Sequence, residues 1–319
     1  MNKSGKIFVA GHGGLVGSAI VRRLRAQGHP DPITRSREDL DLRDPSAVEA
    51  FFSAERPRLV FLAAARVGGI LANSTRPAEF LRDNILIQTH VIDAAYRHGT
   101  HKLVFFGSSC IYPKHAPQPM REEHLLTGPL EPTNEPYAVA KIAGIRMVQA
   151  YREQHGFNGI NLMPTNLYGP GDNFDLQSSH VIPALLRKFH EAKEAGAPRA
   201  IIWGTGKPRR EFLHVDDLAD AALFLAERYD DGGIINVGRG EDLSIRELAE
   251  LIRETVSFQG DITFDDSKPD GTPRKLLDVS RLHRLGWKAR ISLREGLAET
   301  YSWYRKLHEV RGRAGEGRA

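Results

Sequence analysis

Residues 7–24 of the chain read IFVAGHGGLVGSAIVRRL, an apolar run followed by a glycine-rich turn and then by apolar residues at helical spacing. This pattern predicts a buried strand, a tight loop and a helix. Gly11, Gly14 and Gly17 fall in the loop, where glycine permits a sharp turn and a close approach of the backbone to a ligand. The free amides at the start of the helix favour a pyrophosphate. We therefore predict a dinucleotide site at this junction.

The alternation of strand and helix continues through the first half of the chain. Runs such as RLVFLAAA and KLVFF alternate with helical patterns such as NILIQTHVIDAAYRHG, and DPITR reads as a further short strand. Repeated units of this kind predict a parallel sheet with helices on both faces. We therefore expect an α/β fold, a Rossmann-like doubly wound parallel sheet with a smaller C-terminal α/β lobe.

The expected domains follow a loosening of this rhythm after Asn166. Residues 1–166 are predicted to form the dinucleotide-binding domain, to which segments near 212–240 return. Residues 167–308 are predicted to form mainly a substrate-binding lobe. The last residues, 309–319, lack apolar periodicity and predict a disordered tail.

Composition limits the possible partners. The net charge of +4 comes from 44 basic and 40 acidic side chains of dispersed sign, so we expect no nucleic-acid partner. The chain has no apolar run of the roughly 18 residues that a membrane span needs and no signal-like N-terminus, which predicts a cytoplasmic protein without membrane contact. The single cysteine and thirteen scattered histidines predict neither a disulfide nor a metal site.

The segment ITRSREDLDL bears on the choice of cofactor. An acidic residue at the end of the second strand would hold the ribose hydroxyls of NAD, whereas an arginine there suits the 2′-phosphate of NADP. Arg35 and Arg37 precede Glu38 and Asp39, and this order favours NADP. Both arginines could instead form a solvated loop face.

The segment EPYAVAKIAG places Tyr137 and Lys141 four residues apart at the start of a helix, hence one turn from each other. A nearby ammonium group favours the phenolate and lowers the pKa of a tyrosine, so that the phenol can transfer protons near neutral pH. Ser108 follows a buried strand at the sheet edge where such folds bind ligands, and its hydroxyl could polarise a carbonyl group.

Together these motifs resemble the extended short-chain dehydrogenase/reductases. Longer strings narrow the resemblance to the GDP-L-fucose synthase family: VGGILAN, GSSCIYPK, EPTNEPYAVAKIAGI, MPTNLYGPGDNF, SSHVIPALLRKFHEA, REFLHVDD and KPDGTPRKLLDVSRL. The resemblance runs from about Lys6 to Tyr304. It implies an NADPH-dependent enzyme that epimerises GDP-4-keto-6-deoxy-D-mannose at C3 and C5 and then reduces C4 by hydride transfer.

The resemblance also assigns catalytic roles. Tyr137 is the implied proton donor to the C4 oxygen, with Lys141 lowering its pKa and holding the nicotinamide ribose, and Ser108 bonds the same oxygen. Cys110 and His180 are the implied proton carriers for the epimerisations. On an extended segment Cys110 would point to the same side as Ser108. From the residues alone Cys110 reads as a core residue, because cysteine is so often buried.

The family's binding residues map onto two further sets. The implied cofactor contacts are Gly11, His12, Gly13, Gly14, Leu15, Val16, Gly17, Arg37, Asp41, Leu42, Phe106, Gly107, Ser108, Ser109, Lys141, Pro164, Thr165, Asn166, Leu167 and His180. The implied contacts to the guanine nucleotide are Lys188, Trp203, Arg210 and Asp270, with Arg187, Arg209 and Lys275 as nearby candidates; Trp203 could equally be a core residue. Gly13 departs from the pattern, because close relatives often carry an arginine there that helps to hold the 2′-phosphate.

Two alternatives remain open. Another nucleotide-sugar enzyme of the superfamily, such as a UDP-sugar 4-epimerase, would recycle tightly bound NAD and needs neither Cys110 nor His180. A redox-sensing regulator would have kept the dinucleotide fold and lost turnover, but Ser108, Tyr137 and Lys141 are all present. The resemblance further implies a homodimer, formed through NILIQTHVIDAAYRHG and the helix that carries Tyr137.

Overall fold

Five parallel strands form the central sheet of the computed structural model, which describes residues 5–268 and 270–316. Their order across the sheet is β1 (Ile7–Ala10), β2 (Leu59–Leu62), β3 (Lys102–Phe106), β4 (Gly159–Pro164) and β8 (Ile234–Val237). Every residue of these strands is buried, as expected where helices cover both faces of a sheet. This arrangement is the Rossmann-like doubly wound sheet that the sequence predicts.

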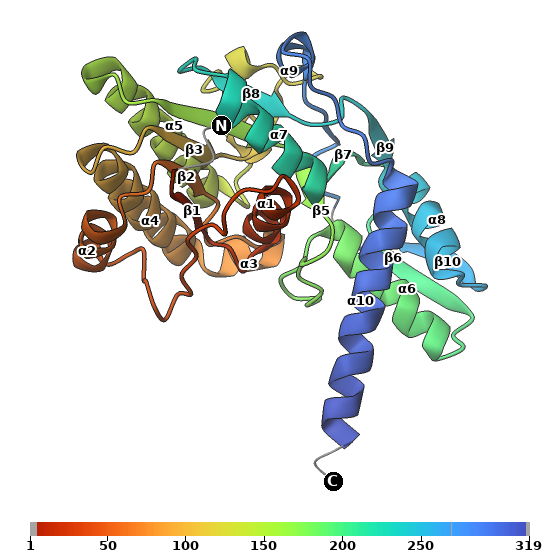
Figure 1. Ribbon diagram of the computed structural model, residues 1–319. Helices are drawn as coiled ribbons and strands as arrows, with labels where there is room; N and C mark the ends of the chain where they lie inside the picture. Colours follow the sequence, from red (N-terminus) through yellow and green to blue (C-terminus); the bar gives the residue numbers. More distant parts are fainter. Residues whose placement is uncertain (1–4, 269, 317–319) are drawn as a thin grey trace.

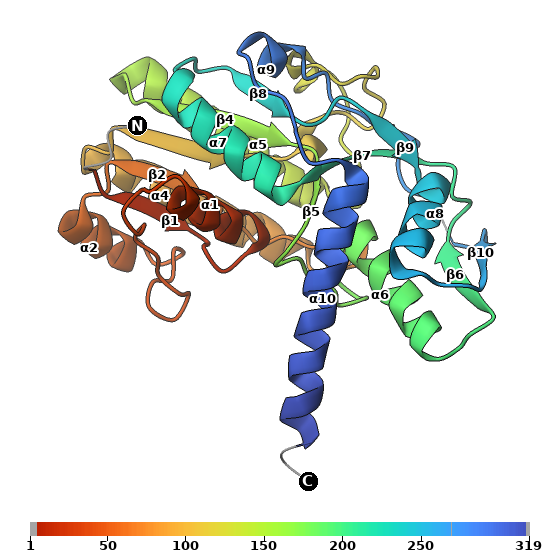
Figure 2. The same cartoon turned by 45° about the vertical axis from the view of Figure 1, so that its right-hand side comes forward.

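Two groups of helices cover the sheet (Figures 1 and 2). Helices α1 (Leu15–Ala26) and α7 (Val215–Arg228) pack together on one face. Helices α2 (Pro45–Glu55), α4 (Pro77–Arg97) and α5 (Glu135–His155) pack on the other. The segment 215–237, which forms α7 and β8, thus lies on the large sheet although it follows β6 and β7 of the smaller lobe in the chain.

The expected strand at DPITR is wrong in extent. Only Ile33 pairs with the sheet, through an isolated parallel bridge to Phe8 beside β1. Pro30 and Pro32 both lie just before this position, and proline cannot donate the amide hydrogen bond that would extend the ladder. The bridge still places residue 33 on one side of β1 and β2 on the other. Successive strands are therefore added on one side of β1 first and then on its other side. Open α/β sheets bind ligands where the strand order changes direction in this way.

The smaller lobe is built from two short sheets. Strands β6 (Arg199–Trp203) and β10 (Asp261–Asp265) form a parallel pair, while β11 (Arg274–Lys275), β7 (Arg209–His214) and β5 (Asn166–Tyr168) form a second sheet in that order. Strand β9 (Asp242–Ser244) pairs with β7 in the antiparallel sense. A separate apolar core joins these strands to helices α6 (Val181–Glu194), α8 (Ile245–Val256) and α10 (Leu293–Glu316).

The disordered tail expected at 309–319 stays a prediction. Helix α10 continues to Glu316, and residues 317–319 lie outside the described residues. An ion pair of 3.6 Å between Arg305 and Glu309, one helical turn apart, is of the kind that favours continuation of a helix. In Figures 1 and 2, α10 extends beyond the rest of the lobe.

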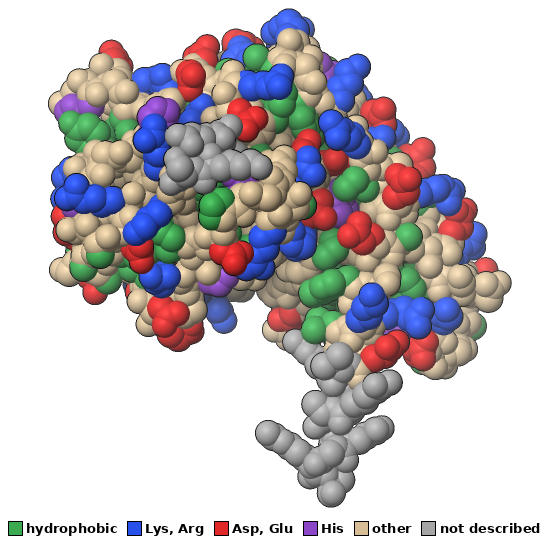
Figure 3. Space-filling model, viewed as in Figure 1, with side chains coloured by type: hydrophobic (Ala, Val, Ile, Leu, Met, Phe, Trp, Pro, Cys, Tyr) green, Lys and Arg blue, Asp and Glu red, His purple; other side chains and the backbone are tan. Residues whose placement is uncertain are grey.

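The remaining elements are short: α3 (Ile70–Thr75), α9 (Ser280–Arg284), and the 3-10 turns η1 (Ser109–Ile111) and η2 (Glu122–His124). Basic and acidic side chains are interspersed on the face shown in Figure 3. Among the described residues, no helix has the length and apolarity that crossing a bilayer requires.

A buried carboxylate ties the two lobes together. Glu211 on β7 is fully buried and accepts hydrogen bonds from the amides of Arg239 at 2.6 Å and Gly240 at 2.7 Å, just after β8. Its second oxygen accepts from the amide of Leu277 at 2.9 Å, just after β11. Burial raises the pKa of this carboxyl, and the three amides oppose the rise. Glu211 therefore fixes the chain segment that carries Lys275 against the large sheet.

We predict that Glu211→Ala lowers the free energy of unfolding by about 3 kcal/mol, because it leaves three amides without their partner in the interior. Urea denaturation of both proteins measures the change. The matched control is Glu241→Ala, which removes an exposed carboxylate paired with Arg239 and should cost less than about 1 kcal/mol. Equal losses in the two variants would contradict the role of Glu211.

Candidate active site

The glycine loop has the geometry that a bound pyrophosphate needs. Gly11 has a φ of +84°, and a Cβ atom on Gly17 would lie 2.1 Å from the carbonyl oxygen of Gly11. Helix α1 thus approaches the end of β1 as closely as glycine allows. Gly14 is the N-cap residue and no side chain caps the first turn, so its amides remain available to an anion. The loop therefore fits a dinucleotide.

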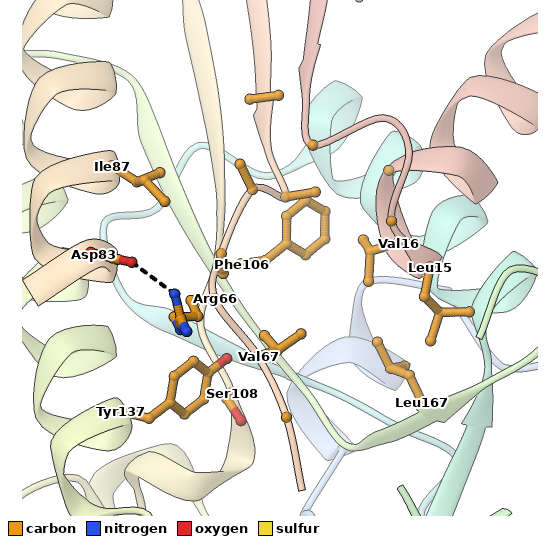
Figure 4. A pocket seen from close by; sticks show the side chains of 18 of the residues that line it. Leu15, Val16, Arg66, Val67, Asp83, Ile87, Phe106, Ser108, Tyr137 and Leu167 are labelled. Carbon is orange, nitrogen blue, oxygen red and sulfur yellow. Dashed lines mark hydrogen bonds and ion pairs between the residues drawn. The ribbon is translucent and has the colours of Figure 1, made fainter. Parts of the chain in front are cut away.

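A pocket of about 880 Å³ opens at the carboxyl ends of β1, β2, β3 and β4. It is lined by most of the predicted cofactor residues: Gly11, Gly14, Leu15, Val16, Gly17, Arg37, Asp41, Leu42, Phe106, Gly107, Ser108, Ser109, Lys141, Pro164, Thr165, Asn166, Leu167 and His180. Tyr137 also lines it. Figure 4 shows Leu15, Val16 and Leu167 on one side of the pocket and Tyr137 with Ser108 on the other. His12 and Gly13 do not line this pocket.

One end of the pocket is lined by three arginines and one aspartate: Arg35, Arg37, Arg43 and Asp41. Arg37 is exposed there, whereas Arg35 pairs with Glu55 at 2.8 Å. Arg43 binds both oxygens of Asp41, and this contact lowers the pKa of Asp41 to about 2. The carboxylate nearest this end is therefore already neutralised by an arginine. Such a basic end suits a phosphate better than a bare ribose.

Tyr137 lies in the first turn of α5, which starts just after Asn134 and carries Pro136 near its N-terminus. Lys141 is buried and donates a hydrogen bond of 2.8 Å to the carbonyl oxygen of Phe106 at the end of β3. Its Nζ lies 5.8 Å from the centre of the Tyr137 ring. Figure 4 shows the Tyr137 hydroxyl directed toward Ser108. The structure thus brings these three side chains together.

The pKa of Tyr137 departs from the expectation. Burial raises it above its ordinary value, and a hydrogen bond with Ser108 acts in the opposite direction without reversing the rise. Burial also lowers the pKa of Lys141 to about 8. Desolvation therefore dominates the pKa of both groups in the protein alone. Tyr137 keeps its proton at neutral pH, which is the form that a proton donor requires.

Cys110 is buried in turn η1 and does not line the pocket directly. The expected extended segment is wrong here, because the Ser108 Oγ accepts from the Cys110 amide at 3.3 Å and caps the 3-10 turn. Burial raises the pKa of the thiol, while Ser108, Lys275 and Lys141 oppose the rise. Cys110 is therefore a buried thiol surrounded by a hydroxyl and two ammonium groups, which ordinary core cysteines lack.

His180 is the N-cap residue of α6 and lines the pocket from the side opposite to the large sheet. Solvent reaches it through the pocket, but protein surrounds it on most sides, and this desolvation lowers the pKa of the imidazole. The ring is therefore neutral near pH 7.

The predicted nucleotide contacts gather on the smaller lobe, outside the pocket described above. Lys188 Nζ lies 4.8 Å from the centre of the Trp203 ring, which is 63% exposed and so is not a core residue. Asp270 accepts from the Thr205 amide at 2.9 Å and hydroxyl at 2.7 Å and faces the charge of Arg210. An exposed indole between ammonium groups can stack on a base. Arg210 is paired in register with Lys275 across β7 and β11.

Of the nearby candidates, two are already engaged. Arg187 binds Glu191 at 2.7 Å and the carbonyl oxygen of Phe174 at 3.1 Å. Arg209 binds Asp242 at 3.0 Å. Lys275 differs, because its ammonium group is enclosed between Cys110, Arg210 and Glu131, and burial lowers its pKa. It therefore lies between the thiol and the nucleotide residues.

The sequence reading missed an arginine cluster at the pocket wall. Asp83 on α4 is buried and contacts Arg66 at 3.1 Å, Arg82 at 2.7 Å and Arg43 at 3.6 Å. Figure 4 shows the contact between Asp83 and Arg66. Burial alone raises the pKa of Asp83, but these arginines outweigh it and the pKa lies below its ordinary value. Arg66 follows β2, so the rule that ligands bind at the carboxyl ends of strands could have identified it.

Comparison with known proteins gives the class of this chain. Residues 7–238 match the model of the NAD dependent epimerase/dehydratase family, to which the chain belongs. It is 61% identical over 304 residues to the probable GDP-L-fucose synthase 1 of Oryza sativa subsp. japonica, a match that covers 95% of this chain and 93% of that protein. Identity to the GDP-L-fucose synthase of Escherichia coli (strain K12) is 54%, over 94% of this chain and 96% of that protein.

A solved structure agrees with these relatives. The GDP-L-fucose synthetase from Naegleria fowleri bound to NADP superimposes with a TM-score of 0.89 at 28% identity, covering 97% of this chain and 96% of the other. Within the broad family, the similarity therefore places the chain among the GDP-L-fucose synthases. The resemblance noted in the sequence is confirmed at the level of family and fold, and the site residues remain predictions.

We predict that Lys275→Met slows alkylation of Cys110 by iodoacetamide severalfold at pH 7.5. Removing the ammonium group removes one influence that lowers the thiol pKa, so less thiolate is present. Because the chain has one cysteine, the labelling rate reports Cys110 alone.

Two further variants control this experiment. Lys275→Arg keeps the positive charge and should keep the rate, while Lys288→Met removes an exposed lysine outside the pocket and should leave it unchanged. An unchanged rate in Lys275→Met would show that Lys275 does not act on the thiol.

Proposed function

We propose that this chain converts GDP-4-keto-6-deoxy-D-mannose to GDP-L-fucose, with epimerisation at C3 and C5 followed by reduction at C4. The observation that carries the proposal is the coexistence of two proton-transfer sets around Ser108: Tyr137 with Lys141 on one side and Cys110 on the other. The proteins named GDP-L-fucose synthase at 54% and 61% identity support the choice of substrate.

The reduction uses Tyr137, Ser108 and Lys141. A bound nicotinamide cofactor supplies the hydride to C4. The Tyr137 hydroxyl holds its proton at neutral pH because it is buried, and it donates that proton to the C4 oxygen as negative charge develops there. Ser108 supplies a second hydrogen-bond donor to the same oxygen. Lys141 stabilises the phenolate that remains.

The epimerisations use Cys110 and His180. The C4 ketone acidifies the hydrogens on C3 and C5, so one group removes a proton and another returns one to the opposite face of the ring. Burial keeps Cys110 as a thiol and His180 as a neutral imidazole, so the pair holds one transferable proton and one free acceptor. If the thiol proton moves to the imidazole, the pair becomes a thiolate and an imidazolium and still holds one transferable proton. Lys275 and Lys141 lower the cost of the thiolate form.

The guanine nucleotide is assigned to the smaller lobe. Trp203 offers an exposed ring for the base, and Lys188, Arg210 and Lys275 offer positive charge for the pyrophosphate. Asp270, fixed by Thr205, can accept from the base. In this arrangement the substrate runs from β6 toward Ser108, with Lys275 between its two ends.

NADP is the proposed cofactor, and a homodimer the proposed assembly. The exposed Arg37 and the neutralised Asp41 support a phosphate at the ribose end of the pocket, and the related Naegleria fowleri structure is bound to NADP. Helices α4 and α5 pack against each other along their length, and Val139 on α5 is 42% exposed. These helices are the proposed contact between protomers.

The decisive experiment is incubation with GDP-4-keto-6-deoxy-D-mannose and NADPH in deuterated water, with the product read by NMR. We expect GDP-L-fucose carrying deuterium at C3 and C5, with one NADPH consumed per product. Cys110→Ser should bind NADPH normally but lose deuterium incorporation by about 10²-fold or more. Tyr137→Phe should retain exchange and lose reduction by a similar factor.

Each alternative predicts a different result. Normal exchange in Cys110→Ser would refute the role of the thiol. Turnover of a UDP-sugar without net NADPH consumption would identify a 4-epimerase. Full reductase activity in Tyr137→Phe would refute the role of the tyrosine, whereas NADPH binding without turnover of any sugar nucleotide by the wild-type chain would favour the regulator.

Gly13→Arg tests the cofactor assignment separately. A Cβ atom at residue 13 would meet no atom within 4 Å, so a side chain can leave the backbone there without a clash at its first atom. A guanidinium group there adds a charge-assisted contact to the 2′-phosphate, and the ratio of kcat/KM for NADPH to that for NADH should rise about tenfold. Gly13→Gln is the uncharged control. An equal ratio in all three proteins would place the 2′-phosphate away from this loop.

A further inference from the structure

Asp172 is a buried carboxyl group at the pocket wall to which neither the sequence motifs nor the reaction assigns a task. It lies in the loop between β5 and α6, is 9% exposed and lines the pocket. Its Oδ1 accepts from the Asn173 amide at 2.8 Å. Its Oδ2 is buried and has no hydrogen-bond partner in the part of the chain that the structure describes. Such a group normally has a partner, so its ligand is expected from the pocket.

The loop holds Asp172 beside the first turn of α1. A Cβ atom on Gly171 would lie 3.2 Å from Ser18 Oγ and 4.0 Å from Leu15 Cα, so the backbone of the loop rests on the helix N-terminus. Phe174 anchors the other side by stacking on Tyr304 of α10, with ring centres 4.5 Å apart. Asp172 therefore cannot swing into solvent without unpacking the loop.

The surroundings of Asp172 favour its neutral form. Burial raises its pKa to about 7, and only the Asn173 amide opposes the rise. The charged or titratable side chains on the elements packed around the loop are Arg22 on α1, Asp216 on α7, His180 and Arg187 on α6, Glu299 on α10, and Asp175 in the loop itself. Arg22 is paired with Asp216, and Arg187 with Glu191.

We propose that Asp172 is a cofactor-binding residue whose carboxylic acid donates a hydrogen bond from Oδ2 to an oxygen of the dinucleotide beside the first turn of α1. The inference rests on the dinucleotide binding of the proposed function. A pyrophosphate at the helix N-terminus carries negative charge and would repel a carboxylate, whereas an undissociated acid adds a donor to the helix amides. Binding of the anion raises the affinity of Asp172 for its proton further.

The sign of the pH dependence follows from this linkage. The bound form of the protein holds the Asp172 proton more tightly than the free form, so proton loss above pH 7 weakens cofactor binding. If the carboxylate instead accepted a hydrogen bond from a ribose hydroxyl, cofactor binding would strengthen over the same range. The two chemistries therefore differ in direction.

The test is the dissociation constant of NADPH, measured by its fluorescence without sugar nucleotide between pH 6 and pH 9. Asp172→Asn keeps a neutral donor at every pH, so the ratio of the wild-type Kd to that of this variant should rise about tenfold from pH 6.5 to 8.5. Lys141 titrates in this range in both proteins, and the ratio cancels its effect. Asp172→Ala should bind about tenfold more weakly at pH 6.5.

Asp266→Asn is the matched control, because it removes an exposed carboxyl group outside the pocket and should follow the wild-type Kd at every pH. A Kd ratio that stays constant, or falls with pH, would overturn the proposal. So would a higher melting temperature of Asp172→Asn without cofactor, combined with an unchanged Kd, since that result makes the carboxyl purely structural. Failure of the wild-type chain to bind NADPH at any pH would overturn the proposed function as well.

Discussion

The close packing of α1 on the end of β1 is the constraint on which the rest of the site depends. A single methyl group at Gly17 would collide with the carbonyl oxygen of Gly11. Because the contact is so tight, the first amides of α1 face the edge of the sheet and remain uncapped. The loops after β2, β3 and β4 then complete the pocket around this helix end. The positions of Lys141 and Ser108 at the far end of β3 are consequences of the same parallel order.

Much of this arrangement could be predicted from the sequence. Strand and helix periodicity gave the sheet and its covering helices, because burial on both faces produces continuous apolar runs. The motifs predict the candidate catalytic residues, and the pocket gathers Ser108, Tyr137, Lys141 and His180 from three separate segments. The length of the edge strand at Ile33 could not be predicted, because a proline shortens the hydrogen-bonded ladder without changing the apolar pattern of the sequence.

The pKa shifts and charge contacts of the site were harder to predict from the sequence than the positions of its residues. Spacing placed Lys141 near Tyr137 but could not show that burial raises the pKa of the tyrosine. The turn at Cys110 depends on one hydroxyl that caps it, and the lysine that influences the thiol comes from residue 275, far along the chain. Asp83 gathers arginines from three segments, and the Oδ2 atom of Asp172 is buried without a hydrogen-bond partner among the described residues. Such properties arise from packing and have no local signature.

Glu211 has a mechanical consequence for substrate entry. It joins the end of β8 in the large sheet to the end of β11 in the smaller lobe through one buried side chain. A hinge rotation that opened the two lobes would have to break these three bonds at once in the dry interior. Admission of a long ligand therefore falls to the loops around Val67 and Leu176 and to Leu71 on α3, whose apolar side chains are exposed at the surface. With the two lobes joined in this way, a ligand that enters the pocket meets side chains from both lobes at a fixed spacing.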